Sequence, residues 1–260
     1  MHLPATQIAL KHRVHAEINQ HFAAHEAEET CLLLDSTGPG LTRQYIVLNA
    51  IGIERLHNFD AIHAFSGSVF ALFGFMAFST AQNRISIDDL CDPKTEQIFR
   101  RQHHAHWFSG MHAVGKLLLG RSAFQSTAPL IACLETMFGE FVDQPFSHFG
   151  SNIHIYLARQ KNQPLLVLSN NAQCSPELES LRATPIKHII AMAANVPFVY
   201  GGVRADTPYF DPVYTQHYVA SLKQIGKAHA STLISTPWRS GKKQRRHYVN
   251  CYPDGNARWH

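Results

Sequence analysis

The segment FDAIHAFSGSVFALFGFMAFSTA, residues 59–81, decides the expected fold of this chain. Residues 59–65 are mostly apolar, which predicts a strand buried in a parallel sheet. From Ser66 onward the residues are apolar on nearly every face of a helix, and such a helix belongs in the core. The segment therefore predicts a buried strand, a sharp turn at Ser66 and a buried helix.

A similar unit precedes this segment. TCLLLD, residues 30–35, is a continuous apolar run that predicts a buried strand; the small-residue turn STGPG follows at 36–40, and a helix is expected over 43–56. Together with 59–65 this makes a βαβ unit with a right-handed crossover. Further helices are expected at 6–27, 94–119, 127–141, 184–195 and 213–225, and further strands at 152–160, 164–169 and 231–236. This alternation predicts an α/β fold, a three-layer α/β/α sandwich with a mostly parallel central sheet.

Length and composition predict one globular domain over residues 1–260. The chain is 45% hydrophobic and 16% charged, which excludes an intrinsically disordered protein. Its formal net charge of +4 is too small for a nucleic-acid-binding footprint, although it allows peripheral contact with an anionic membrane. The composition does not specify an oligomeric state.

The termini and cysteines predict a cytoplasmic protein. The first twenty residues lack the apolar core of a secretory signal, and the apolar run 69–78 is about half the length of a membrane span. The five cysteines are scattered without a C-x-x-C pair, as expected of reduced thiols.

Ser66 is the first candidate for chemistry. A serine between a buried strand and a buried helix has the geometry of a nucleophile elbow, which needs small residues two positions before and two after it. Ala64-Phe65-Ser66-Gly67-Ser68 meets that need, although both usual glycines of G-x-S-x-G are replaced. The alternative is an ordinary helix N-cap serine.

Two other segments could complete an acyl-transfer site. The loop Asp35-Ser36-Thr37-Gly38-Pro39-Gly40 follows the preceding strand and ends at the same edge of the sheet, where backbone N–H groups could form an oxyanion hole. Tyr209-Phe210-Asp211-Pro212 puts a carboxylate at an expected strand end, and the proline biases Asp211 towards extended backbone. The alternatives are an ordinary strand-to-helix turn for the loop and a helix cap for Asp211.

In this order the three segments resemble the patatin-like phospholipase family. LLLDSTGPGL corresponds to the glycine loop of that family, FDAIHAFSGSVFALF to its elbow and PYFDPV to its catalytic aspartate, while IIAMAANVP is similar to its A-x-x-A-x-P stretch. The resemblance covers residues 30–215 and implies a patatin-like fold and a Ser-Asp dyad. It implies an acyl-chain substrate, on a lipid or an acyl thioester carrier, and a lid or acyl-binding region at 83–120. It implies no metal and no other cofactor.

The resemblance also implies a role for each site residue. Ser66 would be the nucleophile and Asp211 the base, and the oxyanion hole would be formed by Thr37, Gly38, Pro39, Gly40 and Gly67. The chain departs from the family pattern where Ser36 and Thr37 replace loop glycines and Pro212 replaces the glycine after the aspartate. These departures leave open an acyltransferase or chain-releasing enzyme with the same dyad, or an inactive module that binds a lipid or partner.

The histidines suggest two further hypotheses, a catalytic triad and a metal site. An α/β-hydrolase triad would pair Ser66 with a late histidine such as His229 or His247, but that fold normally has several βα units before its elbow, and here only one is expected. The densest histidine group, His103, His104, His106 and His112, lacks a nearby cysteine or carboxylate and is interpreted as a solvated or lid-facing stretch.

Overall fold

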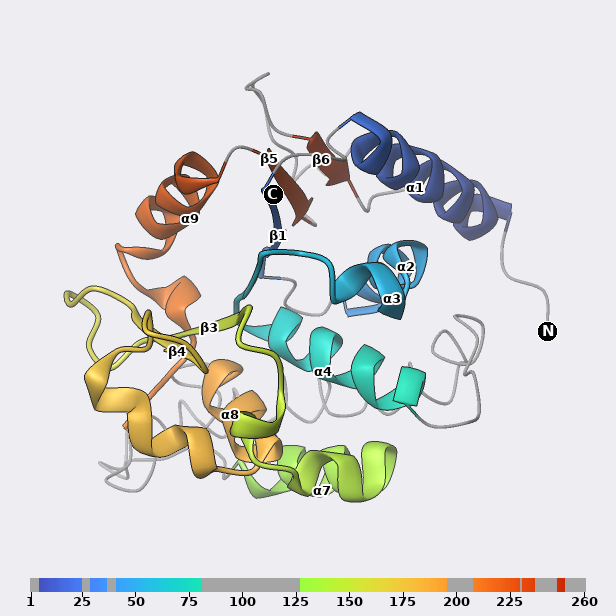
Figure 1. Cartoon of the computed structure of the whole chain (residues 1–260). Coiled ribbons are helices and arrows are strands. Elements are labelled where there is room, and N and C mark those ends of the chain that lie inside the picture. Colours follow the sequence, from blue (N-terminus) through green and yellow to red (C-terminus); the bar gives the residue numbers. More distant parts are fainter. Residues whose placement is uncertain are drawn as a thin grey trace, which may run out of the picture.

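The computed structural model describes residues 5–24, 29–36, 41–80, 127–195, 208–229, 231–236 and 247–250. Their centre is a six-stranded sheet with the strand order β4-β3-β2-β1-β5-β6 (Figure 1). The strands are β1 (Thr30–Leu34), β2 (Ala61–Ala64), β3 (Ile153–Leu157), β4 (Leu166–Ser169), β5 (Ser231–Thr236) and β6 (His247–Asn250). All neighbouring strands pair in parallel except β3 and β4, which are antiparallel, so β4 is an antiparallel edge on an otherwise parallel sheet.

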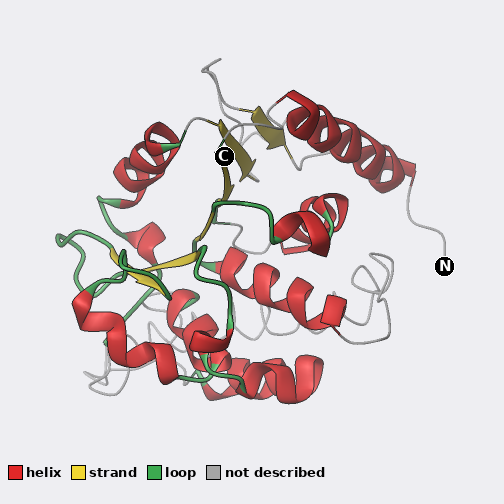
Figure 2. Cartoon of the chain, viewed as in Figure 1, coloured by secondary structure: helices red, strands yellow, loops and turns green. Residues whose placement is uncertain are grey.

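Helices flank this sheet (Figure 2). The α-helices are α1 (Ala5–Ala24), α2 (Leu41–Ile51), α3 (Ile53–Leu56), α4 (Gly67–Thr80), α7 (Ala128–Phe138), α8 (Ile186–Ala193) and α9 (Tyr218–Ala228). Short 3₁₀ helices are η1 (Gly139–Asp143), η2 (Phe146–His148), η3 (Pro176–Ala183) and η4 (Pro212–Tyr214).

The two faces of the sheet bury different sets of residues. Leu32 and Leu34 of β1 pack into the main core with α1, α2 and α4, whereas Cys31 and Leu33 face a smaller cluster that includes Ile225 of α9. This is the alternation of a strand that is covered on both faces. Figure 1 accordingly shows α9 on one side of the strands and α2 and α4 on the other.

Helix α4 lies in the main core, as its sequence predicts. Phe70, Phe73 and Phe75 are buried, and Phe78 is half-buried against the same core. Full burial of each such ring contributes about 1.5–3 kcal/mol of transfer free energy. This packing fixes α4, which follows Ser66 directly, and so it also fixes the C-terminal side of the turn at Ser66.

The α/β fold with a mostly parallel sheet is confirmed, and some boundaries are corrected. The helix expected over 43–56 is broken at Gly52, whose φ of 81° is a backbone conformation that glycine adopts readily. The helix expected from Val213 begins only at Tyr218, because the chain first forms η4 and a turn. The expected lid region 83–120, the helix at 94–119 and the histidine group at 103–112 lie outside the described residues.

Two further expectations can be compared with the described residues. None of their helices combines the length and apolarity of a membrane span. Cys31, Cys133 and Cys174 are not joined in disulfides among the described residues, and Cys31 and Cys174 are buried.

Candidate functional site

Ser66 occupies a strained turn between β2 and α4. Its φ is 55°, and it is the one non-glycine residue with positive φ in the part of the chain that the structure describes. A side chain in this left-handed region costs about 1–2 kcal/mol. Neighbouring hydrogen bonds hold the turn: Phe65 N–H donates to the Leu34 carbonyl of β1, and Ser68 N–H donates to the Phe65 carbonyl. Ser66 therefore has the backbone of a nucleophile elbow.

Asp211 reaches the same end of the sheet through an attachment to β3. Ala158, directly after β3, and Phe210 exchange two backbone hydrogen bonds of 3.0 and 2.8 Å. The Asp211 N–H donates to the Asn195 carbonyl at 2.9 Å, while the Asn195 side-chain amide donates to the Tyr209 carbonyl at 2.9 Å. Since β3 is the neighbour of β2, this segment brings Asp211 beside Ser66.

The Ser66 hydroxyl donates a hydrogen bond to Asp211 Oδ2. The other carboxylate oxygen, Oδ1, accepts the Val213 N–H at 3.0 Å. Both site residues are buried, Ser66 with 5% and Asp211 with 2% of its surface exposed. Burial raises the pKa of Asp211 to about 6, against the opposing effects of the hydrogen bonds from Ser66 and Val213. The carboxylate is therefore a base that can both take up and release a proton near neutral pH.

Of the residues expected to form the oxyanion hole, the structure describes Gly67. Gly67 is the first residue of α4, where backbone N–H groups have no partner inside the helix. The helix terminus directly behind Ser66 also favours negative charge. Thr37, Gly38, Pro39 and Gly40 lie outside the described residues, so their contribution stays a prediction.

A buried polar network fixes the residues that lead into that loop. The Asp35 carboxylate accepts hydrogen bonds from its neighbour Ser36 N–H at 2.7 Å and from the Tyr218 hydroxyl of α9. The Asp35 carbonyl accepts the Ser68 hydroxyl and the Gln44 side-chain amide, the latter at 3.0 Å. Four elements thus meet at the start of the loop: β1, α2, α4 and α9.

The sequence did not predict this network. In the sequence, Asp35 and Ser36 stand out only as loop residues and Ser68 only as a small residue of the elbow. Gln44 and Tyr218 carry no signal, because their partners are 9 to 183 residues away. Burial and the Asp35 carboxylate both raise the pKa of Tyr218, so this hydroxyl stays protonated and donates.

The described histidines near the sheet have partners other than the dyad. His217 Nε2 lies 3.1 Å from the Asn162 carbonyl, and His229 Nε2 lies 3.4 Å from His63 Nε2. The side chain of His247 is outside the described residues. In the described part of the chain, the Ser66 hydroxyl is hydrogen-bonded to Asp211.

One group of side chains could hold a metal ion. Cys31 of β1, His63 of β2 and His229, which caps the end of α9, have ligand atoms that all lie within 4.8 Å of one another. This group is not recognisable in the sequence, because its members are far apart in the chain. A usable signal was the polar His63 inside an otherwise apolar buried strand.

Comparison with protein-family models, with curated proteins and with solved structures gave no match to this chain. The site is therefore interpreted from its own geometry.

Proposed function

We propose that this protein is a serine acyl hydrolase that cleaves an acyl ester or thioester through a Ser66–Asp211 dyad. The observation that carries the proposal is the hydrogen bond from the hydroxyl of Ser66 to Asp211 Oδ2, made by a serine with a φ of 55°. An N-cap serine needs neither the left-handed backbone nor a buried carboxylate on its hydroxyl. A nucleophile needs both a tight turn that directs its hydroxyl away from the strand and helix and a base to accept its proton.

The reaction begins when Ser66 Oγ attacks the acyl carbonyl carbon. Asp211 Oδ2 takes the hydroxyl proton, and the carbonyl oxygen becomes an oxyanion beside the Gly67 N–H and the N-terminus of α4. Collapse of the tetrahedral intermediate breaks the bond to the leaving oxygen or sulfur, which receives the proton from Asp211. The acyl group is then bonded to Ser66.

Hydrolysis repeats these steps with water. Asp211 takes a proton from water as its oxygen attacks the acyl carbon, and the second tetrahedral intermediate expels Ser66, which regains its proton from Asp211. A carboxyl group with a pKa of about 6 suits both directions, since its protonated and ionised forms are both accessible at neutral pH.

The patatin-like resemblance supports the substrate class. It favours a lipid-like acyl chain, with residues 83–120 as the lid or acyl-binding region. The charge of +4 is compatible with acyl donors at an anionic surface. The buried Phe70 and Phe73 belong to the core beneath the elbow, so acyl contacts are expected from other residues.

Fluorophosphonate labelling tests the nucleophile. The wild type should be labelled, Ser66→Ala should not, and Ser147→Ala, which changes an exposed serine of η2, should be labelled like the wild type. A panel of acyl esters and thioesters of increasing chain length then defines the substrate. Absence of labelling in a folded wild type would refute the enzyme and favour an inactive binding module. Acyl products that form only with an added acceptor would indicate an acyltransferase.

A further inference from the structure

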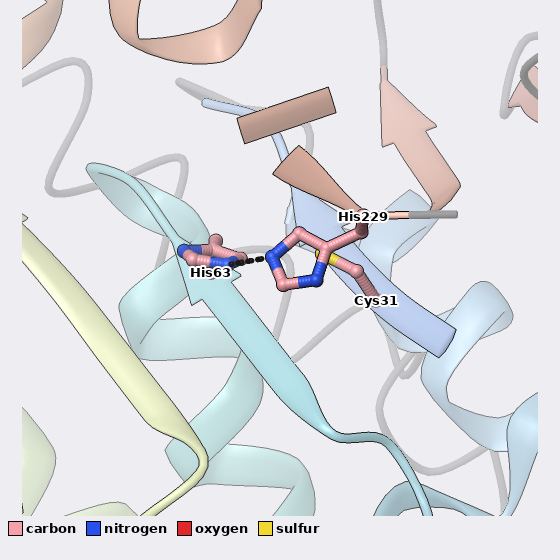
Figure 3. A group of neighbouring side chains, drawn as sticks. All are labelled: Cys31, His63 and His229. Carbon is pink, nitrogen blue, oxygen red and sulfur yellow. Dashed lines mark hydrogen bonds between the residues drawn. The ribbon is translucent and has the colours of Figure 1, made fainter. Parts of the chain in front are cut away.

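Three side chains converge on the α9 face of the sheet. Cys31 and His63 project from the neighbouring strands β1 and β2, and His229 reaches them from the end of α9 (Figure 3). His63 Nε2 and His229 Nε2 lie 3.4 Å apart, and one ligand atom from each of the three residues lies within 4.8 Å of the others. Cys31 and His63 are buried, while His229 is half-buried, so an ion could enter from the His229 side.

The separations suit a tetrahedral ion. Zinc binds histidine nitrogen at about 2.0–2.1 Å and cysteine sulfur at about 2.3 Å. Tetrahedral angles then place two ligand nitrogens about 3.4 Å apart and a nitrogen and a sulfur about 3.6 Å apart. The two histidine nitrogens already have this separation. Since the ligand atoms of the three residues lie within 4.8 Å of one another, the sulfur would approach the ion through a rotation of the Cys31 side chain.

The outer nitrogen of each histidine faces an oxygen atom. His63 Nδ1 is hydrogen-bonded to the Tyr156 hydroxyl at 2.9 Å, whereas His229 Nδ1 lies 3.5 Å from a Glu29 carboxylate oxygen without a hydrogen bond to it. Metal-bound histidines usually donate this second N–H to an oxygen acceptor, which fixes the ring. With both outer nitrogens protonated, the two Nε2 lone pairs face each other, and a shared cation removes the repulsion between them.

We propose that Cys31 Sγ, His63 Nε2 and His229 Nε2 bind one zinc ion, with a water molecule as the fourth ligand. On binding, the Cys31 thiol loses its proton to solvent and its thiolate bonds to the ion. Thiolate and imidazole ligands together select zinc over calcium or magnesium. The ion would join β1, β2 and the end of α9. Its ligand His63 is two residues before Phe65, whose ring stacks on Tyr156 next to the elbow serine. Its role is therefore structural support of the elbow, independent of the acyl chemistry.

The test uses the full chain with Co²⁺ as a spectroscopic probe and Zn²⁺ in a chelator competition. The wild type should show a thiolate-to-cobalt charge-transfer band and the strong d–d bands of a tetrahedral site. It should also bind one more equivalent of zinc than Cys31→Ser or His229→Gln. His229→Gln changes a half-buried residue outside the strands, so it remains informative if Cys31→Ser fails to fold. Cys174→Ser, at another buried cysteine, is the matched control and should keep both signals.

A variant with a partial effect distinguishes zinc binding at this site from zinc binding by other histidines of the chain. Tyr156→Phe keeps the ring beside Phe65 but removes the hydroxyl on His63, and it should weaken zinc binding about 10- to 100-fold. The proposal is overturned if the wild type lacks the thiolate–cobalt band. It is also overturned if Cys31→Ser and His229→Gln keep the band and the full zinc stoichiometry, which would leave a metal-free Tyr156–His63–His229 hydrogen-bond chain.

Discussion

The Ser66 hydroxyl and the Asp211 carboxylate are hydrogen-bonded although 145 residues separate them in the chain. Ser66 is held by the core, between β2 and α4, whereas Asp211 is held by Ala158 and Asn195. The two residues of the proposed dyad are thus positioned by different parts of the fold.

Asp211→Asn should be nearly as inactive as Ser66→Ala, because both variants remove the same proton-transfer unit and losses within such a unit do not add. The double variant should be no worse than either single one. Steady-state turnover on the best acyl ester measures this, with His217→Gln as a matched histidine variant that should retain most activity. An active Asp211→Asn enzyme beside an inactive histidine variant would replace the dyad with a histidine triad.

The pH profile of kcat/KM should have an acidic limb centred near pH 6. Asp211 must be ionised to accept the Ser66 proton, and burial raises its pKa to about 6, so activity falls as pH decreases through that value. The profile is measured with a substrate that does not itself ionise in this range. A flat profile between pH 5 and pH 7, with Asp211 still essential, would contradict the raised pKa.

Asp211→Asn should also stabilise the protein at neutral pH. The folded state holds the Asp211 proton up to a pKa of about 6, whereas the unfolded chain releases it at the ordinary value of 3.8. Stability therefore decreases as pH rises from about 4 to 6, and the cost of the buried charge at pH 7 is at most about 3 kcal/mol.

Chemical denaturation at pH 4, 6 and 7 checks this effect. The variant should lose the wild type's decrease in unfolding free energy over this range. Glu177→Gln, at an exposed carboxylate of η3, should unfold with the pH dependence of the wild type. A variant that is less stable than the wild type at pH 7 would show that the hydrogen bonds of Asp211 outweigh its desolvation.

Ser66→Gly should be at least as stable as Ser66→Ala, by up to about 1 kcal/mol, although both are inactive. Glycine relieves the left-handed strain at φ 55°, and alanine keeps the Cβ atom that causes it. Ala71→Gly, inside α4, is the control and should lose about 1 kcal/mol or more. Thermal unfolding of the three variants measures the contrast, and a less stable Ser66→Gly than Ser66→Ala would argue against strain at the elbow.

Tyr218→Phe should lower kcat about tenfold with little change in KM, less than the loss of a direct oxyanion donor. The variant removes the hydroxyl that donates to Asp35 and accepts the Ser36 N–H, so the loop after Ser36 loses its anchor, while the ring stays beside Phe65. Tyr214→Phe, at an exposed tyrosine, should behave as the wild type. If Tyr218→Phe lowers stability but not kcat, the contact is structural only.

The fold was predictable where the signal is local. Buried strands and the apolar helix α4 are encoded in consecutive residues, so β1, β2 and α4 were found nearly to their ends. The direction of β4 was not predictable, because alternation of apolar residues is the same for a parallel and an antiparallel strand. The break at Gly52 was missed because a single glycine is also tolerated inside a helix.

The candidate site divides in the same way. Ser66 and Asp211 lie in short motifs, and the structure brings them together. Asn195 positions Asp211, and Gln44 and Tyr218 hold Asp35 at the start of the loop, through contacts that arise only after the chain has folded. Cys31, His63 and His229 are likewise united by the sheet and not by spacing in the sequence.

The attachment of Phe210 to Ala158 affects the point during unfolding at which activity would be lost. Two backbone hydrogen bonds and the contacts of Asn195 hold the segment of Asp211, whereas Ser66 lies between Ala64 and Val69, which both belong to the main core. Local opening of this segment costs less free energy than global unfolding. In increasing urea, hydrolysis should therefore cease before the sheet melts, and inactivation and the far-ultraviolet transition should have separate midpoints.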